Sequence, residues 1–235
     1  DGDTITFDCT AARDSTVPGR EWYWQFGGGD AASGPIVTHP FAKPGSRAVA
    51  LRFANSRGEW ATTEKAVRIE PAWLRRALAQ GAVWVEAESL AAEGEGTSQV
   101  VAGRVNASGG AISYWEKDHG HWLEWRVTVA APGAYAVVLK YASGSPSATR
   151  DCRIDGDFPG EAWRRLAFPG TGGFSLDADN WVWQPLQDAN GVPLQVDLTA
   201  GTHALRLGNL GGGMALDGLL LVPVGFLPEP FPRAA

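Results

Sequence analysis

Hydrophobic and polar residues alternate along most of this chain, which predicts β-strands. In the run from His121 to Val129, the side chains of Leu123, Trp125 and Val127 fall on one face and their polar neighbours on the other. Successive side chains of a strand point to opposite faces, so this run is predicted to be a strand with one buried side. Further strand-like runs lie at residues 4–7, 21–26, 47–53, 66–69 and 135–141.

Turn-forming residues separate these runs. The chain has 235 residues, of which 30 are Gly and 15 are Pro, and this frequency favours many short strands joined by tight turns. Asp155-Gly156 predicts a hairpin turn, and Ala200-Gly201 is expected to turn a strand at 195–198 into one at 204–207. We expect about eight to ten strands between residues 82 and 224.

Helical periodicity is convincing in one stretch, residues 72–80, where Trp73 and Ala77 recur at helical spacing and Gly81 follows as a stop signal. We interpret this stretch as a connector between two all-β domains. The regular turn spacing before it predicts a small β-sandwich. The predicted organisation is a domain at 1–71, a helical connector at 72–81, a second domain at 82–225 and a Pro-rich tail at 226–235.

Composition excludes several classes of protein. Hydrophobic residues make up 44% of the chain and the net charge is -6, which is globular and gives no basic surface for nucleic acid. No apolar run is long enough to span a membrane, and we expect no membrane partner. Cys9 and Cys152 lie too far apart in sequence for a local framework, so buried free thiols are expected, with an inter-domain disulfide as the alternative. The chain opens without a signal peptide, as a piece of a longer protein would.

The first domain resembles the PKD family of immunoglobulin-like modules. The motifs that carry this resemblance are a Trp-Gln-Phe-Gly-Gly-Gly-Asp run at residues 24–30, followed by Thr-His-Pro-Phe at 38–41 and Pro44-Gly45. Gly28 stands where the family usually has an acidic residue. The resemblance implies an immunoglobulin-like β-sandwich that acts as a spacer, without chemistry of its own.

The second domain resembles the calcium-binding β-jelly-roll carbohydrate-binding modules of the family 6, 35 and 36 type, and family 35 fits best. The resemblance implies a jelly roll that binds sugar. Two departures concern the ligand site: Ala215 replaces a sugar-contacting Asn, and the loop from Thr171 to Gln184 is longer than usual. The motifs shared with the family, in order, lie at residues 85–88, 106–110, 120–125, 131–135, 168–172, 198–201 and 216–217.

Glu86 and Glu88 are two residues apart on a predicted strand, so their carboxylates share a face. Hard oxygen ligands of this kind suit Ca²⁺, although an exposed acidic edge strand gives the same pattern. The family resemblance implies a structural calcium site at Glu86, Glu88 and Asp217, with backbone carbonyls of the turn at 106–110 completing the shell.

Several aromatic residues follow polar loops. Trp115 and Trp181 are predicted to form a sugar-binding platform at the loop end of the second domain, with Tyr114 and Asn209 as supporting contacts. An aromatic face matches the C–H face of a pyranose, and an Asn amide both donates to and accepts from hydroxyls. For each Trp, burial in the core is the alternative.

Two other sets of residues could carry chemistry. His119 and His121 could chelate zinc, but no third ligand lies nearby in sequence, so solvated loop histidines are the competing interpretation. The pair Asp177 and Asp179, or residues 155 and 157, could act as the acid and base of a glycosidase, whereas aspartates are also common in turns for backbone reasons.

The sequence therefore predicts a non-catalytic, calcium-stabilised carbohydrate-binding module behind a PKD-like spacer. Its expected partners are a polysaccharide and the catalytic domain of a larger, secreted or cell-surface enzyme of polysaccharide degradation. Arg150, Arg153 and Arg164 suggest an anionic sugar such as a uronic acid. The alternatives are a small jelly-roll hydrolase or lyase, and an adhesive or spacer fragment without a ligand.

Overall fold

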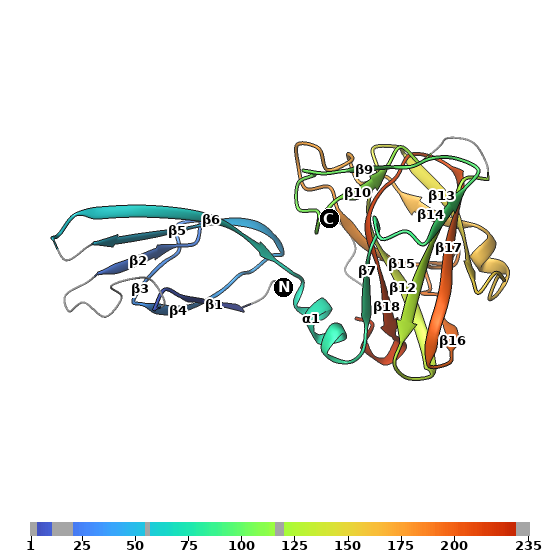
Figure 1. The fold of residues 1–235 in the computed structure, drawn as a ribbon, viewed down its shortest axis with the longest axis horizontal. Coiled ribbons are helices and arrows are strands. Elements are labelled where there is room, and N and C mark those ends of the chain that lie inside the picture. Colours follow the sequence, from blue (N-terminus) through green and yellow to red (C-terminus); the bar gives the residue numbers. More distant parts are fainter. Residues whose placement is uncertain (1–3, 11–20, 55–56, 116–119, 229–235) are drawn as a thin grey trace. The chain divides into compact units, whose positions relative to one another are not determined.

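The computed structural model describes residues 4–10, 21–54, 57–115 and 120–228 (Figure 1). The chain forms two compact units, Asp1–Arg75 and Arg76–Ala235, and the division falls within helix α1 (Ala72–Ala79). The all-β prediction is confirmed, since strands dominate both units. The finer domain limits stay predictions, and the tail beyond residue 228 lies outside the described residues.

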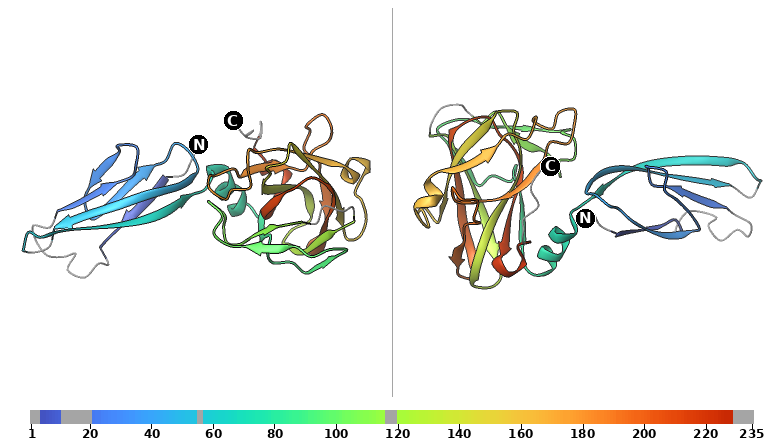
Figure 2. Two further views of the ribbon diagram at one scale, coloured as in Figure 1. Left: turned by 90° about the horizontal axis from the view of Figure 1, so that it is seen from above. Right: turned by 180° about the vertical axis from the view of Figure 1, so that it is seen from behind.

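The first unit contains two antiparallel sheets around an aromatic core (Figures 1 and 2). Trp22 and Trp24 alternate with exposed residues along one strand and point inward, as the period of two requires. The Trp24 indole donates a hydrogen bond to the Gly34 carbonyl at 2.9 Å. One sheet pairs β1 (Thr4–Asp8) with β4 (Ile36–Pro40); the other has the order β3 (Ala31–Ser33), β2 (Trp22–Gln25), β5 (Gly45–Ala54) and β6 (Trp60–Ile69).

The predicted helix is present as α1. Trp73, Leu74 and Ala77 are buried, whereas Leu78 is largely exposed. The helix ends at Ala79, and Gly81, two residues on, has a φ of 91°, in the left-handed region that glycine adopts without strain.

The second unit is a sandwich of two antiparallel sheets (Figure 1). Its core lies between the sheets and includes Leu123 and Trp125 from one sheet and Val137, Leu139 and Leu219 from the other. Strands β10 to β13 alternate between the two sheets, a connectivity typical of a jelly roll. One sheet has the order β15 (Val182–Pro185), β12 (Gly133–Ala142), β18 (Ala215–Pro223), β10 (Ala111–Ser113) and β9 (Gln99–Val101), with β16 (Val196–Leu198) on β12 and β7 (Val83–Glu86) on β18. The other has the order β14 (Leu166–Pro169), β13 (Ser147–Ile154), β17 (Gly201–Gly211), β11 (Trp122–Val129) and β8 (Ala92–Gly94).

Two expectations about the second unit are wrong. Its described residues form twelve strands, from β7 to β18, because short strands such as β8 carry no clear alternation. The Ala200-Gly201 turn does not close a hairpin: β16 pairs with β12, whereas β17 crosses to the opposite sheet. Hydrophobic alternation is the same for a strand that folds back and a strand that crosses over, so the sequence pattern does not identify the partner.

Other expectations agree with the structure. Asp155 and Gly156 both have positive φ, as a tight turn of the predicted type requires. Cys9 and Cys152 are buried free thiols, and burial raises the pKa of each. Within the described part of the chain, no helix has the length and apolar character needed to cross a membrane.

Candidate functional site

A pocket of about 500 Å³ opens at one end of the second unit, where several inter-strand connections meet. It combines apolar and aromatic walls with a few polar groups, the usual make-up of a small-ligand site. Its lining residues are Arg104, Ser113, Tyr114, Trp115, Ser145, Phe174, Leu176, Gly212, Gly213, Met214 and Ala215.

Two large side chains that line this pocket are exposed to solvent. Tyr114 is 68% exposed and Leu176 is 59% exposed. Tyr114 directly follows β10 and has a φ of 52°, a conformation that costs a bulky residue energy and is often found at functional sites. The loop that carries Leu176 is closed by two hydrogen bonds between Ser175 and Asn180. The pocket therefore has an aromatic ring and an aliphatic side chain available to a ligand.

Arg104 supplies the positive charge of the pocket. Its side chain is buried, and it donates hydrogen bonds to the Ser113 hydroxyl at 2.6 Å and to the Phe174 carbonyl. No acidic side chain among the described residues forms an ion pair with this guanidinium, and its buried Nε has no hydrogen-bond acceptor among them. Burial lowers the pKa of Arg104, which still leaves the group charged at neutral pH.

The connection between β17 and β18 forms the floor of the pocket. Gly212 has a φ of 77°, and a Cβ atom there would overlap the Ser147 carbonyl oxygen. The Gly213 amide donates to the Ser145 hydroxyl at 3.0 Å, and a Cβ at Gly213 would press on Phe174. Glycine is therefore required for this connection to lie so close to its neighbours.

Arg150 supports the floor from behind. Its fully buried guanidinium donates to the carbonyls of Thr149, Gly211 and Gly212 at 2.7, 2.9 and 3.0 Å. It also lies over the Trp115 ring, 4.3 Å from the ring centroid. Burial lowers the pKa of Arg150 to about 9, so this group remains a cation at neutral pH.

The structure separates the four predicted sugar-binding residues. Tyr114 and Trp115 line the pocket, but Trp115 is only 4% exposed and belongs to the core, so it offers no open ring face. Asn209 lies within β17, not in a loop, and its buried side chain accepts a hydrogen bond from the Gly211 amide at 3.0 Å. The expectations of an exposed Trp115 and a loop Asn209 are therefore wrong: polar flanking residues did not prevent either from packing inward.

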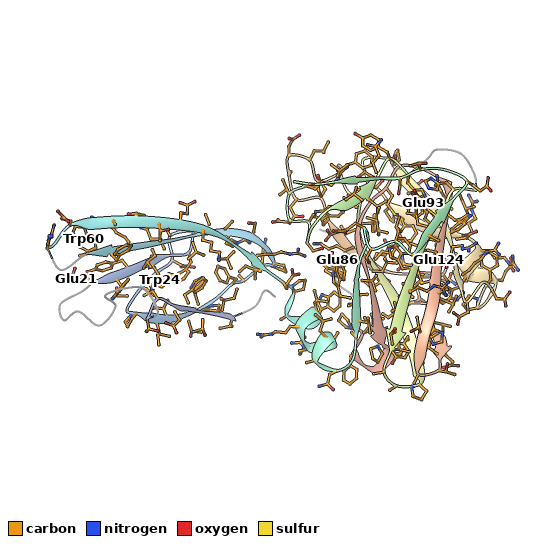
Figure 3. All side chains as sticks on the ribbon, viewed as in Figure 1. Glu21, Trp24, Trp60, Glu86, Glu93 and Glu124 are labelled. Atoms are coloured by element: carbon orange, nitrogen blue, oxygen red, sulfur yellow. The ribbon has the colours of Figure 1, made fainter. Side chains whose placement is uncertain are left out.

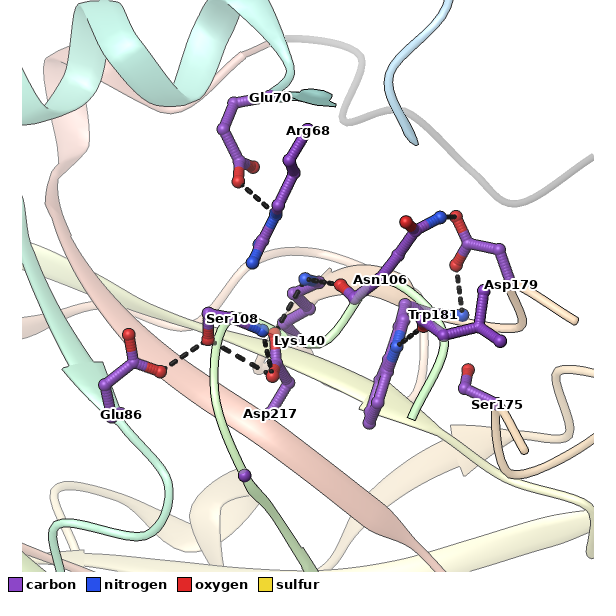
Figure 4. Close-up of polar contacts among 12 residues, drawn as sticks. Arg68, Glu70, Glu86, Asn106, Ser108, Lys140, Ser175, Asp179, Trp181 and Asp217 are labelled. Carbon is purple, nitrogen blue, oxygen red and sulfur yellow. Dashed lines mark hydrogen bonds and ion pairs between the residues drawn. The ribbon is translucent and has the colours of Figure 1, made fainter. Parts of the chain in front are cut away.

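Trp181 lies elsewhere, beside the turn that follows β9 (Figure 4). It is partly buried, and its indole donates to the Val105 carbonyl at 2.7 Å. Its backbone amide donates to Asp179, whose other carboxylate oxygen accepts from Asn106 at 2.7 Å. Trp181 is absent from the pocket lining and instead braces the turn at 105–108.

Two of the predicted calcium ligands, Glu86 and Asp217, contact Ser108 of this turn (Figure 4). Asp217 is fully buried and accepts hydrogen bonds from the amide and hydroxyl of Ser108 at 2.8 and 3.2 Å. Glu86 accepts from the same hydroxyl. Glu88 accepts from the Gly110 amide at 2.9 Å. The three carboxylates therefore lie around residues 108–110.

Lys140 is the cation beside this cluster. Its ammonium lies 2.6 Å from Asp217 Oδ2 and donates to the Asn106 carbonyl at 2.9 Å. The side chain is almost completely buried. Three carboxylates against one ammonium leave an excess of two negative charges in this partly buried region.

The donor set is compatible with calcium. Glu88 Oε2 is buried and accepts no hydrogen bond from the described residues, whereas Asp217 Oδ2 is paired with the Lys140 ammonium. Hard carboxylate oxygens are the ligands that Ca²⁺ prefers. No three Asp, Glu, His or Cys side chains in the described residues come together as a metal-holding group. Backbone carbonyls of the turn would therefore have to complete a coordination shell.

The described residues of the alternative chemistries are absent from the pocket lining. Asp155 binds His203 and the Ala204 amide, with its carboxylate at 2.7 and 2.8 Å from them. Neither Asp177 nor Asp179 lines the pocket. His119 lies outside the described residues, and His121 is buried, with its Nε2 3.6 Å from Glu93.

Sequence reasoning missed Arg104, Leu176 and Met214 as pocket residues. Arg104 lies in an irregular segment between two short strands, and no motif marks it. A usable signal was available for Leu176, since it is a large apolar residue inside the polar loop between Thr171 and Gln184. Met214 follows a run of three glycines, at residues 211–213, where β17 ends and the connection to β18 begins.

Both units resemble known proteins. Residues 1–69 match the family model of the PKD domain, which confirms the prediction for the first unit. The solved structures that resemble this chain include modules of the predicted families. One is a family 35 carbohydrate-binding module from Clostridium thermocellum, with 19% identity and a TM-score of 0.47, where the match covers 60% of this chain and 96% of that chain. A family 35 module from Paenibacillus barcinonensis has 20% identity and a TM-score of 0.47, with 60% and 98% of the two chains covered. The C-terminal family 6 module of a marine laminarinase from Zobellia galactanivorans has 19% identity and a TM-score of 0.45, with 60% and 98% covered. A search of curated proteins finds no match.

Proposed function

We propose that the second unit binds a glycan in the loop-end pocket and does not cleave it. The observation that carries the proposal is the composition of the pocket wall: an exposed tyrosine ring, an exposed leucine and a buried guanidinium around about 500 Å³. Volumes of this size accommodate small ligands such as a short sugar segment.

Sugar chemistry suits these walls. One face of a pyranose ring presents C–H groups, which pack against the Tyr114 ring and the Leu176 side chain. The hydroxyls at the edge of the sugar need polar partners, and Ser113, Ser145 and the Tyr114 hydroxyl lie in the same lining. Replacement of the family's usual Asn by Ala215 removes one polar contact, so the ligand is expected to differ from that of relatives with the Asn.

Binding without cleavage is favoured by the lack of an acid and base. Glycoside hydrolysis usually needs two carboxyl groups on either side of the scissile bond. Among the described residues that line the pocket, none is Asp, Glu, His or Cys. The two aspartate pairs considered from the sequence lie elsewhere.

An anionic sugar is the finer part of the proposal, and Arg104 is its recognition residue. The sequence had suggested Arg150, Arg153 and Arg164 instead. Arg150 is fully buried behind the pocket, whereas Arg153 and Arg164 both lie over Phe158, each 4.3 Å from its ring centroid. Arg104 lines the pocket without an acidic partner among the described residues, so a uronic acid carboxylate would supply the missing negative charge.

Calcium is proposed as a structural ion at Glu86, Glu88 and Asp217. The buried Glu88 Oε2, which has no hydrogen-bond donor among the described residues, and the excess of two negative charges support a divalent cation at this position. The ion would hold β7, the turn at 108–110 and β18 together. It lies apart from the pocket residues, so its role is stability.

The cellular role is proposed from the sequence resemblance. A glycan-binding unit behind a PKD domain would direct a larger, secreted carbohydrate-active enzyme to its polysaccharide. The catalytic domain of that enzyme would be the covalently attached partner.

A glycan array that contains neutral and uronic acid oligosaccharides tests the proposal. The full chain is applied with Ca²⁺ and with EDTA, and the same sugars are incubated with the protein and analysed for products. We expect retention on a limited set of glycans and no product. Product formation would establish an enzyme, and the lack of retention on every glycan would leave an adhesive or spacer role.

A further inference from the structure

The first unit carries an aromatic pair on the outer face of its four-stranded sheet. Tyr23 on β2 and Trp60 at the start of β6 are 41% and 44% exposed, and their ring centroids are 5.6 Å apart. The Arg52 guanidinium on β5 lies over the Trp60 ring, 4.4 Å from its centroid. We call these three residues the aromatic platform.

Strand register explains why the platform faces outward. Inward and outward side chains alternate along β2, where Trp22 and Trp24 point inward and Tyr23 points outward. Tyr23 pairs directly with Arg52 on β5, so these two side chains share the outer face. Trp24 lies inside the unit in Figure 3, whereas Trp60 lies at its surface, at the same end as Glu21. The core therefore does not account for the platform, and two exposed aromatic rings side by side call for a binding partner.

The platform is held in place by contacts within the unit. The Tyr23 hydroxyl donates to Glu21 at 3.0 Å, which fixes the ring at its far end. The cation–π contact with Arg52 restrains Trp60. Rings that are already ordered lose little conformational entropy when a ligand binds.

Polar side chains surround the two rings on the same face. Thr62 lies opposite Arg52 across the β5–β6 pair, and Gln25 and Glu64 lie on either side of Ala50 in the next row. Flat aromatic rings within a frame of hydroxyl, amide and charged groups match the C–H face and the hydroxyl edge of a sugar chain. A stable protein–protein interface involves about 20–30 residues on each side, far more than this platform.

The charges on this face indicate the kind of glycan. Glu21 and Glu64 bring negative charge and Arg52 brings positive charge, so the face has no excess of cations that would attract a polyanion. We infer that the aromatic platform is a second glycan-binding surface, for an uncharged polysaccharide, in a unit that the sequence assigned to a spacer role. This inference is independent of the pocket in the second unit.

The test uses the full chain with Tyr114→Ala, which removes the exposed pocket aromatic, as the starting protein. Binding isotherms are measured by depletion on insoluble cellulose, chitin and mannan. We expect retention on at least one of these polymers, and a drop of about tenfold or more when Tyr23→Ala and Trp60→Ala are added, because stacking aromatics dominate such sites. Trp60→Phe, which keeps a ring, should recover part of the retention.

Ile36→Ala is the matched control, because Ile36 is 55% exposed on β4 in the other sheet of the same unit. It should leave retention unchanged, and melting curves verify that each variant is folded. If the double variant melts early, the single variants provide the comparison. Retention that is unaltered by loss of both rings, or no retention on any of the three polymers, overturns the inference. Binding of a soluble oligosaccharide to the wild-type chain tests the pocket separately.

Discussion

At the scale of single residues, two buried arginines distinguish the loop end of the second unit. Arg104 lies in the pocket wall and Arg150 behind the floor, and neither forms an ion pair with an acidic side chain in the described part of the chain. Arg150 instead satisfies three backbone carbonyls, which are strong acceptors in a region without bulk water. Its role is structural, whereas Arg104 is the residue proposed to meet the ligand.

Arg150→Met should destabilise the chain by about 2–3 kcal/mol, because carbonyl oxygens of the floor are left without donors. Urea denaturation measures the free energy of unfolding. Arg153→Met, at a partly exposed position on the same strand β13, should change the free energy of unfolding by less than about 1 kcal/mol. Equal effects of the two substitutions would contradict the structural role.

The pair of His203 and Asp155 gives a pH dependence. The hydrogen bond that the His203 ring donates to the Asp155 carboxylate raises the pKa of His203. Burial acts to raise the pKa of Asp155, but this hydrogen bond and the one from the Ala204 amide lower it overall. The histidine contribution to stability is complete below about pH 6.5, the unfolded value, and is lost as pH rises through the raised pKa. The aspartate contribution is present above its unfolded pKa and is lost as pH falls through the lowered one. NMR titration of His203 should show a lower pKa in Asp155→Asn, and an unchanged value would exclude the pair.

Some of the residues singled out from the sequence lie together in the structure. Tyr114 lines the pocket, and Glu86, Glu88 and Asp217 lie around the turn at 108–110, but their roles in binding stay predictions. Trp115 turned inward because its ring covers core residues and is itself covered by Arg150, a contact between residues 35 positions apart that no local pattern contains. Arg104 was missed for the same reason.

At the scale of elements, the connection between β17 and β18 shapes the pocket. Its glycines allow the chain to pass against β13 and Phe174 without side chains in between. Strand positions were predictable from the period of two, but sheet partners were not, as the crossing of β17 shows. Pairing depends on long-range packing, which alternation does not encode.

Gly212→Ala should therefore disturb the pocket. The cost combines a positive φ with overlap of the Ser147 backbone, so we expect a loss of stability of about 2 kcal/mol or more and weaker glycan binding. Gly191→Ala is the matched control, because Gly191 has a similar φ of 81° with open space around it. It should cost about 1 kcal/mol and leave binding intact. Similar results for both would mean that the close approach at Gly212 is unimportant.

At the scale of the whole molecule, the two units have separate hydrophobic cores. The all-β class, the helix between the domains and the two family resemblances were predictable, because each rests on local patterns. Calcium binding depends on the arrangement of Lys140 and three carboxylates that are distant in sequence. The sequence alone does not give this arrangement.

Calcium should stabilise the second unit alone. An ion that binds only the folded state adds about 2.7 kcal/mol at a hundredfold excess over its Kd, so the melting transition of this unit should rise in millimolar Ca²⁺ relative to EDTA. Glu88→Gln should remove most of the shift, and Glu64→Gln, in the first unit, should not. Identical melting in Ca²⁺ and EDTA would exclude the site.

Glycan binding at the loop-end pocket is the central claim, and calorimetric titration with an oligosaccharide retained on the array tests it most directly. Wild type, Tyr114→Ala and the control Val192→Ala, an exposed residue outside the pocket lining, are compared in the full chain. The account predicts that Tyr114→Ala weakens binding by about tenfold or more while Val192→Ala binds as wild type. Wild-type affinity in a folded Tyr114→Ala variant would contradict it.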